Sequence, residues 1–375
     1  MFLRIEKYLR KRANEIVFIE LKEDKYFKAK NLKLSKDISL PIALQKVVSK
    51  VNGKEENDKF SLFDIIQGMI FMLGIDKDFK YNKDYKEFLL NFDENIKFKI
   101  LEQGFKYAQN DRKLNALICF KASLYIDKED INALYNYARI CEELAFDTED
   151  NNDLNYDFYD ESLEVFEVII EKYPDFSLAY YHLGFHYMNR KQYKKAELIW
   201  KTCIEKGIDE EKEMEILNKL SENNYKIQYE EGYSLVLNGR PLEALDKLLP
   251  LTEKYPEWWN LLFFVGLAYR HLKEYEKALS YFKRAHNLKP SQIDILNEMG
   301  LCYMSLGKID DSIRYFKRAV NLKNDLPDIL CNLGSAYIKK GDYGKAREYI
   351  MKSYKINPQD EITIAWIKEL EKITK

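Results

Sequence analysis

A set of residues that recurs every 34 positions constrains this chain more than any other feature of its sequence. Gly266 and Tyr269 are followed by Ala278, Phe282 and Ala285. Shifting by 34 in either direction again finds small residues and large apolar residues at matching places. The four tandem copies are marked by the small residues Gly232, Gly266, Gly300 and Gly334. Agreement in register over four copies excludes chance, so the pattern describes a repeated structural unit and not a catalytic motif.

Three further copies precede these four and carry insertions. Gly104 marks the first copy, and Gly184 keeps the internal spacing but lies 14 residues further upstream than one period allows. The copy marked by Ala138 holds 12 extra residues between its two halves. Seven units are therefore predicted over residues 97–360, with inserts near 147–158 and 208–222.

The repeated positions resemble the tetratricopeptide repeat (TPR), a unit of two antiparallel helices with a small residue where they cross. Gly266 and Ala278 let two helix backbones approach, while Tyr269 and Phe282 fill the space beside them. One unit cannot bury its apolar face alone, so units stack and the last one needs a cap. The resemblance implies an all-α fold, a right-handed TPR superhelix (α-solenoid), closed by a capping helix within residues 361–375.

The composition agrees with long helices and argues against several classes of protein. The 375 residues include only 14 glycines and 8 prolines, too few chain breakers for a sheet-rich fold. A net charge of −2 argues against a dedicated nucleic-acid binder. No window approaches the roughly 18 apolar residues of a membrane span. The 5 cysteines are dispersed and lack a CxxC pair, which indicates reduced thiols and hence a cytoplasmic protein.

Residues 1–96 do not repeat and are expected to form a mostly helical N-terminal module. A small β-hairpin is expected around Lys22–Lys25. Helices are expected over Phe2–Ala13, Pro41–Val51, Phe60–Leu73 and Lys83–Phe92. The first 50 residues carry 13 Lys and Arg against 6 Asp and Glu, whereas the remainder has a net charge of −9. A first helix packed on the repeats is therefore favoured over contact with a membrane or a nucleic acid.

The two inserts differ in character. The acidic insert DTEDNNDLNYDFYDE places Asp153, Asn155 and Asp157 at alternating positions, which loosely resembles a calcium loop. Phe158 stands where such a loop needs a glycine, so a solvated loop is favoured and a calcium site is the alternative. The second insert, IDEEKEMEILNKLSE, predicts an extra helix or a lengthened connector.

Residues suited to catalysis are sparse. Neither a phosphate-binding GxxxxGK motif nor an HExxH motif occurs, and residues 1–96 contain no histidine or cysteine. His182 and His186 stand one helical turn apart, but no third ligand follows from the spacing, so packing is favoured over a metal site. The sequence predicts a protein that is not an enzyme and needs no cofactor.

The repeat register also predicts a binding surface. Residues three before and one after the small residue point away from the packed side. In TPR relatives this face lines the concave groove that takes extended peptides or helices. The predicted groove residues here are Tyr135, Arg139, Tyr181, His182, Phe185, Asn189, Tyr229, Tyr233, Phe263 and Arg270. Since lysines for a carboxylate clamp are missing, the expected ligand is an apolar or aromatic segment.

Two functions follow from this surface, and the oligomeric state stays open. The first is a non-catalytic adaptor that binds a partner peptide or helix, with apolar or aromatic anchors, in the aromatic groove. The second is a regulator whose N-terminal module docks on the superhelix and is released when a peptide binds, since opposite charge favours docking. In a third interpretation the aromatic side chains fill the groove themselves.

Overall fold

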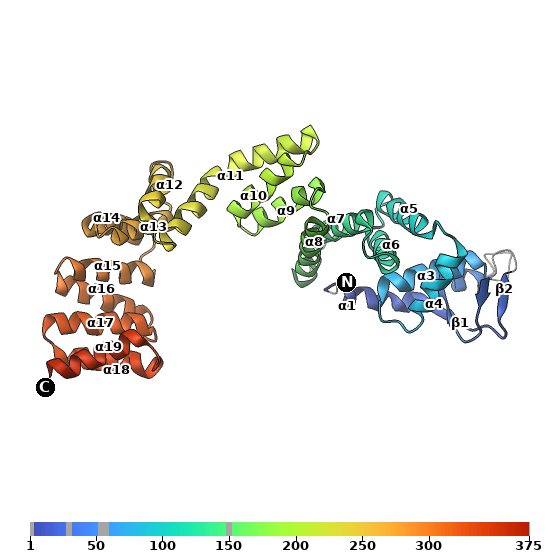
Figure 1. Cartoon of the computed structure of the whole chain (residues 1–375). Helices are drawn as coiled ribbons and strands as arrows, with labels where there is room; N and C mark the ends of the chain where they lie inside the picture. Colours follow the sequence, from blue (N-terminus) through green and yellow to red (C-terminus); the bar gives the residue numbers. More distant parts are fainter. Residues whose placement is uncertain (1–3, 28–31, 52–59, 148–151, 375) are drawn as a thin grey trace. The chain divides into compact units, whose positions relative to one another are not determined.

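The structure is a computed structural model that describes residues 4–27, 32–51, 60–147 and 152–374. The chain divides into two compact units, Met1–Ile216 (unit 1) and Leu217–Lys375 (unit 2) (Figure 1). The described residues form 19 α-helices, one 3-10 helix and four short strands. The helices confirm the predicted α-solenoid with a mostly helical N-terminal part.

The N-terminal part of unit 1 alternates short strands with helices. Its elements are α1 (Glu6–Leu9), η1 (Arg10–Glu15), β1 (Ile16–Ile19), β2 (Lys25–Phe27), β3 (Leu32–Leu34), β4 (Leu40–Ala43), α2 (Leu44–Val51), α3 (Leu62–Ile75) and α4 (Asn82–Phe92). β1 pairs antiparallel with β4, and β2 pairs antiparallel with β3. The β2–β3 pair is a small hairpin, as predicted, but its first strand starts at Lys25 instead of the chain turning around Lys22–Lys25.

The first predicted helix is shorter than expected. In the described part of Phe2–Ala13, α1 forms one turn and the chain then tightens into the 3-10 helix η1. The tighter turn places the Arg12 guanidinium 5.3 Å from the centre of the Phe71 ring. Tertiary contacts of this kind override local helix preference, since 3-10 segments are common at helix ends.

The helix predicted over Pro41–Val51 begins only at Leu44. Pro41 lies instead in β4, opposite Phe18 of β1. β4 crosses α3 where Gly68 has no Cβ, and the Pro41 carbonyl occupies that space. Burial of an extended apolar run therefore decides this segment, although a proline also suits the first turn of a helix.

Helix α3 attaches the N-terminal part to the first helix pair. Ser61 and Asp64 form a capping box at its start, in which each side chain bonds the backbone N–H of the other. Near the other end, Gly74 lies directly against the carbonyl of Ile118 in α6 (Lys113–Ile126), where a larger residue would collide. This close approach makes α3 and α6 neighbours and fixes the position of α3, which forms one wall of a groove against α5 (Ile96–Gln109).

From α5 onward the helices pair in succession. Unit 1 contains α5 (Ile96–Gln109), α6 (Lys113–Ile126), α7 (Ile131–Asp147), α8 (Asn152–Lys172), α9 (Ser177–Asn189) and α10 (Tyr193–Glu205). The boundary between the units falls within α11 (Glu210–Leu237). Unit 2 continues with α12 (Pro241–Lys254), α13 (Trp259–His271), α14 (Tyr275–Leu288), α15 (Ile293–Ser305), α16 (Ile309–Leu322), α17 (Pro327–Lys340), α18 (Tyr343–Ile356) and α19 (Glu361–Ile373). The repeat count and the domain limits stay predictions.

The recurring small residues lie where the two helices of a pair cross. A Cβ added to Gly266 would come within 2.7 Å of the Phe282 ring, and one added to Gly300 within 2.5 Å of the Phe316 ring. Such contacts are closer than packed carbon atoms tolerate, so the glycines permit the helix spacing. The repeat register predicted from these residues therefore corresponds to a real packing requirement.

The described part of the first insert, the second insert and the predicted cap are helical. Asn155 and Asp157 belong to α8, so the expected solvated loop is wrong from Asn152 onward, whereas residues 148–151 lie outside the described residues. The alternating residues lie along a helix and so do not form a calcium loop. The second insert is helical, as its pattern indicated, but it forms the first half of α11 and is neither a separate extra helix nor a connector. α19 follows α18 as the predicted closing helix.

Two features are absent from the described residues. No group of three or more His, Cys, Asp or Glu side chains suited to a metal ion is found among them. No helix in the same residues combines the length and the apolar character needed to cross a bilayer.

Candidate functional site

Four of the predicted groove residues meet on α7 and α9. The Tyr135 hydroxyl lies 3.3 Å from Nε2 of His182. The Tyr181 ring meets the His182 ring edge-on, with centroids 5.3 Å apart, and the Phe185 ring likewise at 5.1 Å. All four side chains are half-buried. We call Tyr135, Tyr181, His182 and Phe185 the aromatic face.

Two glutamates hold the aromatic face in place. Glu142 of α7 bonds Nδ1 of His182 at 2.7 Å, and the imidazole stacks on Phe166. The Tyr181 hydroxyl donates to Glu215 of α11 at 2.5 Å. Burial and this hydrogen bond raise the pKa of Tyr181, so the hydroxyl remains protonated and continues to donate. Fixed rings lose little side-chain freedom when a ligand covers them.

The second histidine lies beneath this face. His186 is fully buried, with Nε2 at 3.4 Å from Glu142 and 3.2 Å from the Ser162 hydroxyl. Its ring lies 4.2 Å from that of Tyr159. Burial lowers the pKa of His186 to about 4, so the ring is neutral near pH 7. These contacts describe a packed interior histidine.

Glu142 was missed by sequence reasoning, although the repeat register carries a signal for it. Glu142 lies four residues after the small residue of its repeat, and His182 lies two before the next small residue. Arg270 and Glu298 occupy the same two places and also form an ion pair. Comparing these places between adjacent repeats would have identified both pairs.

Two predicted groove residues of unit 1 are not part of the aromatic face. The Arg139 guanidinium bonds Glu143 on its own helix at 2.8 Å. The Asn189 amide donates to the Tyr159 hydroxyl of α8 at 2.9 Å. Arg139 remains partly exposed and Asn189 is exposed, so both are accessible at the surface.

The aromatic residues predicted in unit 2 pack mainly against one another and their neighbours. The Tyr229 ring lies 4.4 Å from that of Trp258, and Tyr233 lies 5.3 Å from Phe264. The Phe263 ring lies 5.8 Å from that of Phe282. These contacts agree with the interpretation in which the aromatic side chains fill the predicted groove themselves.

Arg270, the remaining predicted residue of unit 2, is engaged by an acid. Its guanidinium forms an ion pair with Glu298 of α15. Burial raises the pKa of Glu298, while the nearby Arg270 opposes that shift. Arg270 therefore takes part in a contact between adjacent repeats.

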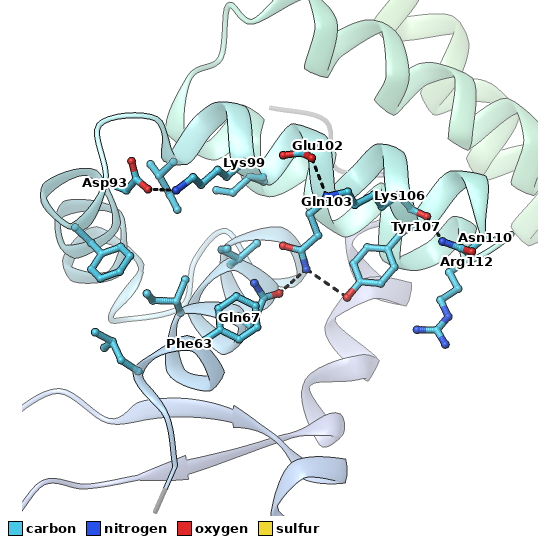
Figure 2. Close-up of a pocket in the computed structure, with 16 residues that line it drawn as sticks. Phe63, Gln67, Asp93, Lys99, Glu102, Gln103, Lys106, Tyr107, Asn110 and Arg112 are labelled. Atoms are coloured by element: carbon cyan, nitrogen blue, oxygen red, sulfur yellow. Dashed lines mark hydrogen bonds and ion pairs between the residues drawn. The ribbon is translucent and has the colours of Figure 1, made fainter.

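A groove absent from the predictions lies between α3 and α5 of unit 1 (Figure 2). Its volume is about 860 Å³, and its apolar lining includes Ile66, Ile70, Ile96 and Ile100. We call it the α3–α5 groove. The sequence hides it because its walls come from the N-terminal part and the first repeat, whose packing follows from the close approach of α3 to α6.

Polar side chains of α3 and α5 cross the groove. Figure 2 shows the Gln103 amide bonded to Gln67 of α3 and to the Tyr107 hydroxyl, the latter at 3.3 Å. Phe63 also lines the groove, and 66% of its surface is exposed. The groove therefore combines apolar surface with hydrogen-bonding groups that are already oriented.

Charged residues of the groove fall into two classes. Lys99 pairs with Asp93, and Lys106 pairs with Glu102 at 2.7 Å. Among the described residues, the Arg112 guanidinium forms no ion pair with an acid. Figure 2 shows Arg112 next to Asn110, at the end of the groove beyond Tyr107. Its positive charge is therefore available to a ligand.

A family model matches part of the chain. Residues 233–367 match the family model described as the Psidin N-terminal TPR repeats region. No curated protein sequence matches the chain significantly.

Three of the solved structures that match this chain are those of PilW, Cut9–Hcn1 and YrrB. The type IV pilus biogenesis factor PilW has 19% identity and a TM-score of 0.40, over 61% of this chain and 98% of its own. The APC/C hetero-tetramer Cut9–Hcn1 has 15% identity and a TM-score of 0.42, over 83% of this chain and 64% of its own. YrrB, a TPR protein with an unusual peptide-binding site, has 17% identity and a TM-score of 0.29, over 66% of this chain and 97% of its own.

Proposed function

We propose that this chain, a tetratricopeptide repeat protein, is an adaptor that binds a segment of a partner protein on the aromatic face. The observation that carries the proposal is the row of rings linked across α7 and α9, half-buried and anchored by Glu142 and Glu215. Aromatic rings held in fixed positions offer a large contact area at a low entropic cost. The proposed ligand segment carries apolar or aromatic anchor residues, and the proposed location is the cytoplasm.

The proposal assigns no catalytic step to this chain. Glu142 is engaged by two histidines, and His186 is buried and neutral near pH 7. A general base must reach a proton on a substrate, and a fully buried imidazole does not. Binding by shape and aromatic contact suits the half-buried face better.

Affinity capture with the intact chain, followed by mass spectrometry, tests this proposal. Tyr181→Ala is expected to lose the specific partner, while Tyr181→Phe keeps the ring and retains it. Tyr156→Ala is the matched control, because Tyr156 is an exposed tyrosine of α8 outside the aromatic face. Circular dichroism should show equal helical content in all variants. Equal capture by the wild-type chain and Tyr181→Ala would refute binding on this face.

A second candidate function, ligand-dependent release of the N-terminal segment (residues 4–15), is favoured by its contacts with α8. The Lys7 ammonium lies 2.8 Å from Asp157, and the Tyr8 hydroxyl donates to the same carboxylate at 2.9 Å. Arg4 forms ion pairs with Glu164 and Asp160. The basic start of the chain thus meets an acidic stretch of the repeats, as a docked regulatory segment requires.

Release of this segment is part of the proposal and has its own test. A bound partner should increase tryptic cleavage at Lys11, and the charge-reversed variant Arg4→Glu with Lys7→Glu should show the increase without a partner. Lys195→Glu, a change at an exposed lysine of α10, is the control. If the partner leaves cleavage unchanged while still binding, the adaptor function stands and the regulatory function is refuted.

A further inference from the structure

We propose that the α3–α5 groove binds an amphipathic helix of a partner protein, with an acidic side chain of that helix set against Arg112. This surface is separate from the aromatic face, and the inference does not depend on the function proposed for that face. The argument rests on the repeat register, the lining of the groove and its charges.

In each repeat, the side of the first helix that carries the residue before the small residue is normally covered by another helix. The repeat register shows which helix that is. In four later repeats the residue before the small residue is fully buried and apolar: Leu183, Val265, Met299 and Leu333. In each case the second helix of the preceding repeat packs on the helix that carries it. The equivalent residue of α5 is Gln103, which is polar and half-buried.

Among the described helices, none covers α5 in this way. α3 packs on α6, through Gly74 and Ile118, and leaves this side of α5 open to the groove. The groove therefore lies on the side of α5 that a preceding helix would cover. A helix from a partner would continue an interface that this chain already builds between successive repeats.

The lining suits one face of a helix. Isoleucines from both walls form the apolar floor, and Phe63 stands at its edge with most of its ring in water. Helices recognised in grooves present apolar residues at i, i+3 or i+4, and i+7. Burial of the exposed Phe63 ring by such residues would supply much of the driving force.

The charges of the groove predict which charge the partner helix carries and at which end. Lys99 and Lys106 already form ion pairs with Asp93 and Glu102, whereas Arg112 forms no ion pair with another described residue. A guanidinium makes its strongest contacts with carboxylates, often through two parallel hydrogen bonds. The expected helix therefore carries an Asp or Glu near the end that approaches Arg112.

Selection from a displayed peptide library on the intact chain tests the proposal. The library presents helices with leucine at i, i+3, i+4 and i+7 and with Asp, Lys or Ser varied on the flanking positions. Enriched helices should carry an acid at one end. In solution their affinity should fall at least about tenfold for Phe63→Ala.

Matched variants separate the groove from other surfaces. Phe98, on α5 but outside the groove lining, is 68% exposed, so Phe98→Ala should leave the affinity unchanged. Arg112→Glu should switch the selected end residue from an acid to lysine, while Arg284→Glu, at an exposed site of α14, should not. Tyr181→Ala should also leave helix binding intact, which keeps this test independent of the aromatic face.

Three outcomes would overturn the inference. The first is no enriched helix, and the second is equal binding to the wild-type chain and Phe63→Ala. The third is self-association of the chain in sedimentation velocity that Phe63→Ala abolishes, because the occupant would then be a second copy.

Discussion

Replacement of Glu6 by glutamine is expected to loosen the N-terminal segment from the repeats. One Glu6 oxygen lies 3.0 Å from the Lys121 ammonium, and the other accepts the backbone N–H of Lys77 at 2.9 Å. Only 7% of the Glu6 side chain and 2% of the Lys121 side chain are exposed. Glutamine has nearly the same shape and keeps an oxygen for Lys77, so the variant removes mainly the charge that faces Lys121.

The size of the effect follows from burial. Removal of one partner of a buried ion pair costs about 3–5 kcal/mol, because the other charge is left buried and unpaired. The apolar contacts of Ile5 and Leu9, both almost fully buried, contribute about 1.5–3 kcal/mol each and oppose release. The segment should thus stay folded most of the time but open more often, by a factor of roughly 10² to 4 × 10³.

Limited trypsin digestion at Lys11 measures this opening, because cleavage follows the open population when opening and closing are fast. Glu6→Gln should raise the cleavage rate at least about a hundredfold. Glu6→Gln with Lys121→Met should recover most of the protection, since apolar replacement of a whole buried pair is often neutral. Glu164→Gln removes a partly exposed partner of Arg4 and should have a small effect. Unchanged cleavage in Glu6→Gln would refute the reasoning.

Three further predictions concern the packed interior. Gly184→Ala should destabilise unit 1 by about 1–3 kcal/mol, because its Cβ would collide with the buried Trp200 ring. Gly344→Ala should not destabilise the chain, because its Cβ would only touch the Asp342 carboxylate at 3.8 Å, and urea unfolding compares the two variants. Burial lowers the pKa of His186 to about 4, so the unfolded chain binds a proton first as pH falls, and the unfolding free energy should drop between about pH 6.5 and pH 4. His186→Gln should make this fall in unfolding free energy smaller by about 3 kcal/mol, as urea unfolding at each pH would measure. Burial raises the pKa of Cys119 to about 12 and all five cysteines are buried, so maleimide should label the native chain slowly and the unfolded chain fully, as mass spectrometry would show.

Each of these predictions has a result that would contradict it. Equal midpoints for the two glycine variants would mean that the helix crossing tolerates a larger residue. A parallel pH dependence in the wild-type chain and His186→Gln would mean that other groups account for acid sensitivity. Rapid labelling of the native chain would show that the thiols are accessible.

The helix pairs could be predicted because their determinants are local and repeated. Gly266 and Phe282 lie on adjacent helices of one pair, so a fixed spacing in sequence becomes a fixed contact in space. The same reasoning failed at Pro41, where a residue suited to a helix start lies in a strand against Gly68 of a distant helix. It also failed at Asn155, since an acidic composition favours exposure to water but does not distinguish a loop from a helix.

The candidate site was predicted in part for the same reason. The repeat register placed Tyr135 and Tyr181 on consecutive first helices, and both contact His182. The register did not show how far each ring would be covered by its neighbours. The α3–α5 groove was out of reach because it depends on how a segment without a repeat packs on the first repeat, as at Gly74.

Hydrogen exchange of the intact chain, with and without its captured partner, tests the central claim most directly. If the partner binds the aromatic face, amide exchange should slow in α7 (Ile131–Asp147) and α9 (Ser177–Asn189). Tyr181→Ala should abolish that protection, and Tyr156→Ala should preserve it. Protection confined to other helices, or none at all with a bound partner, would contradict the account.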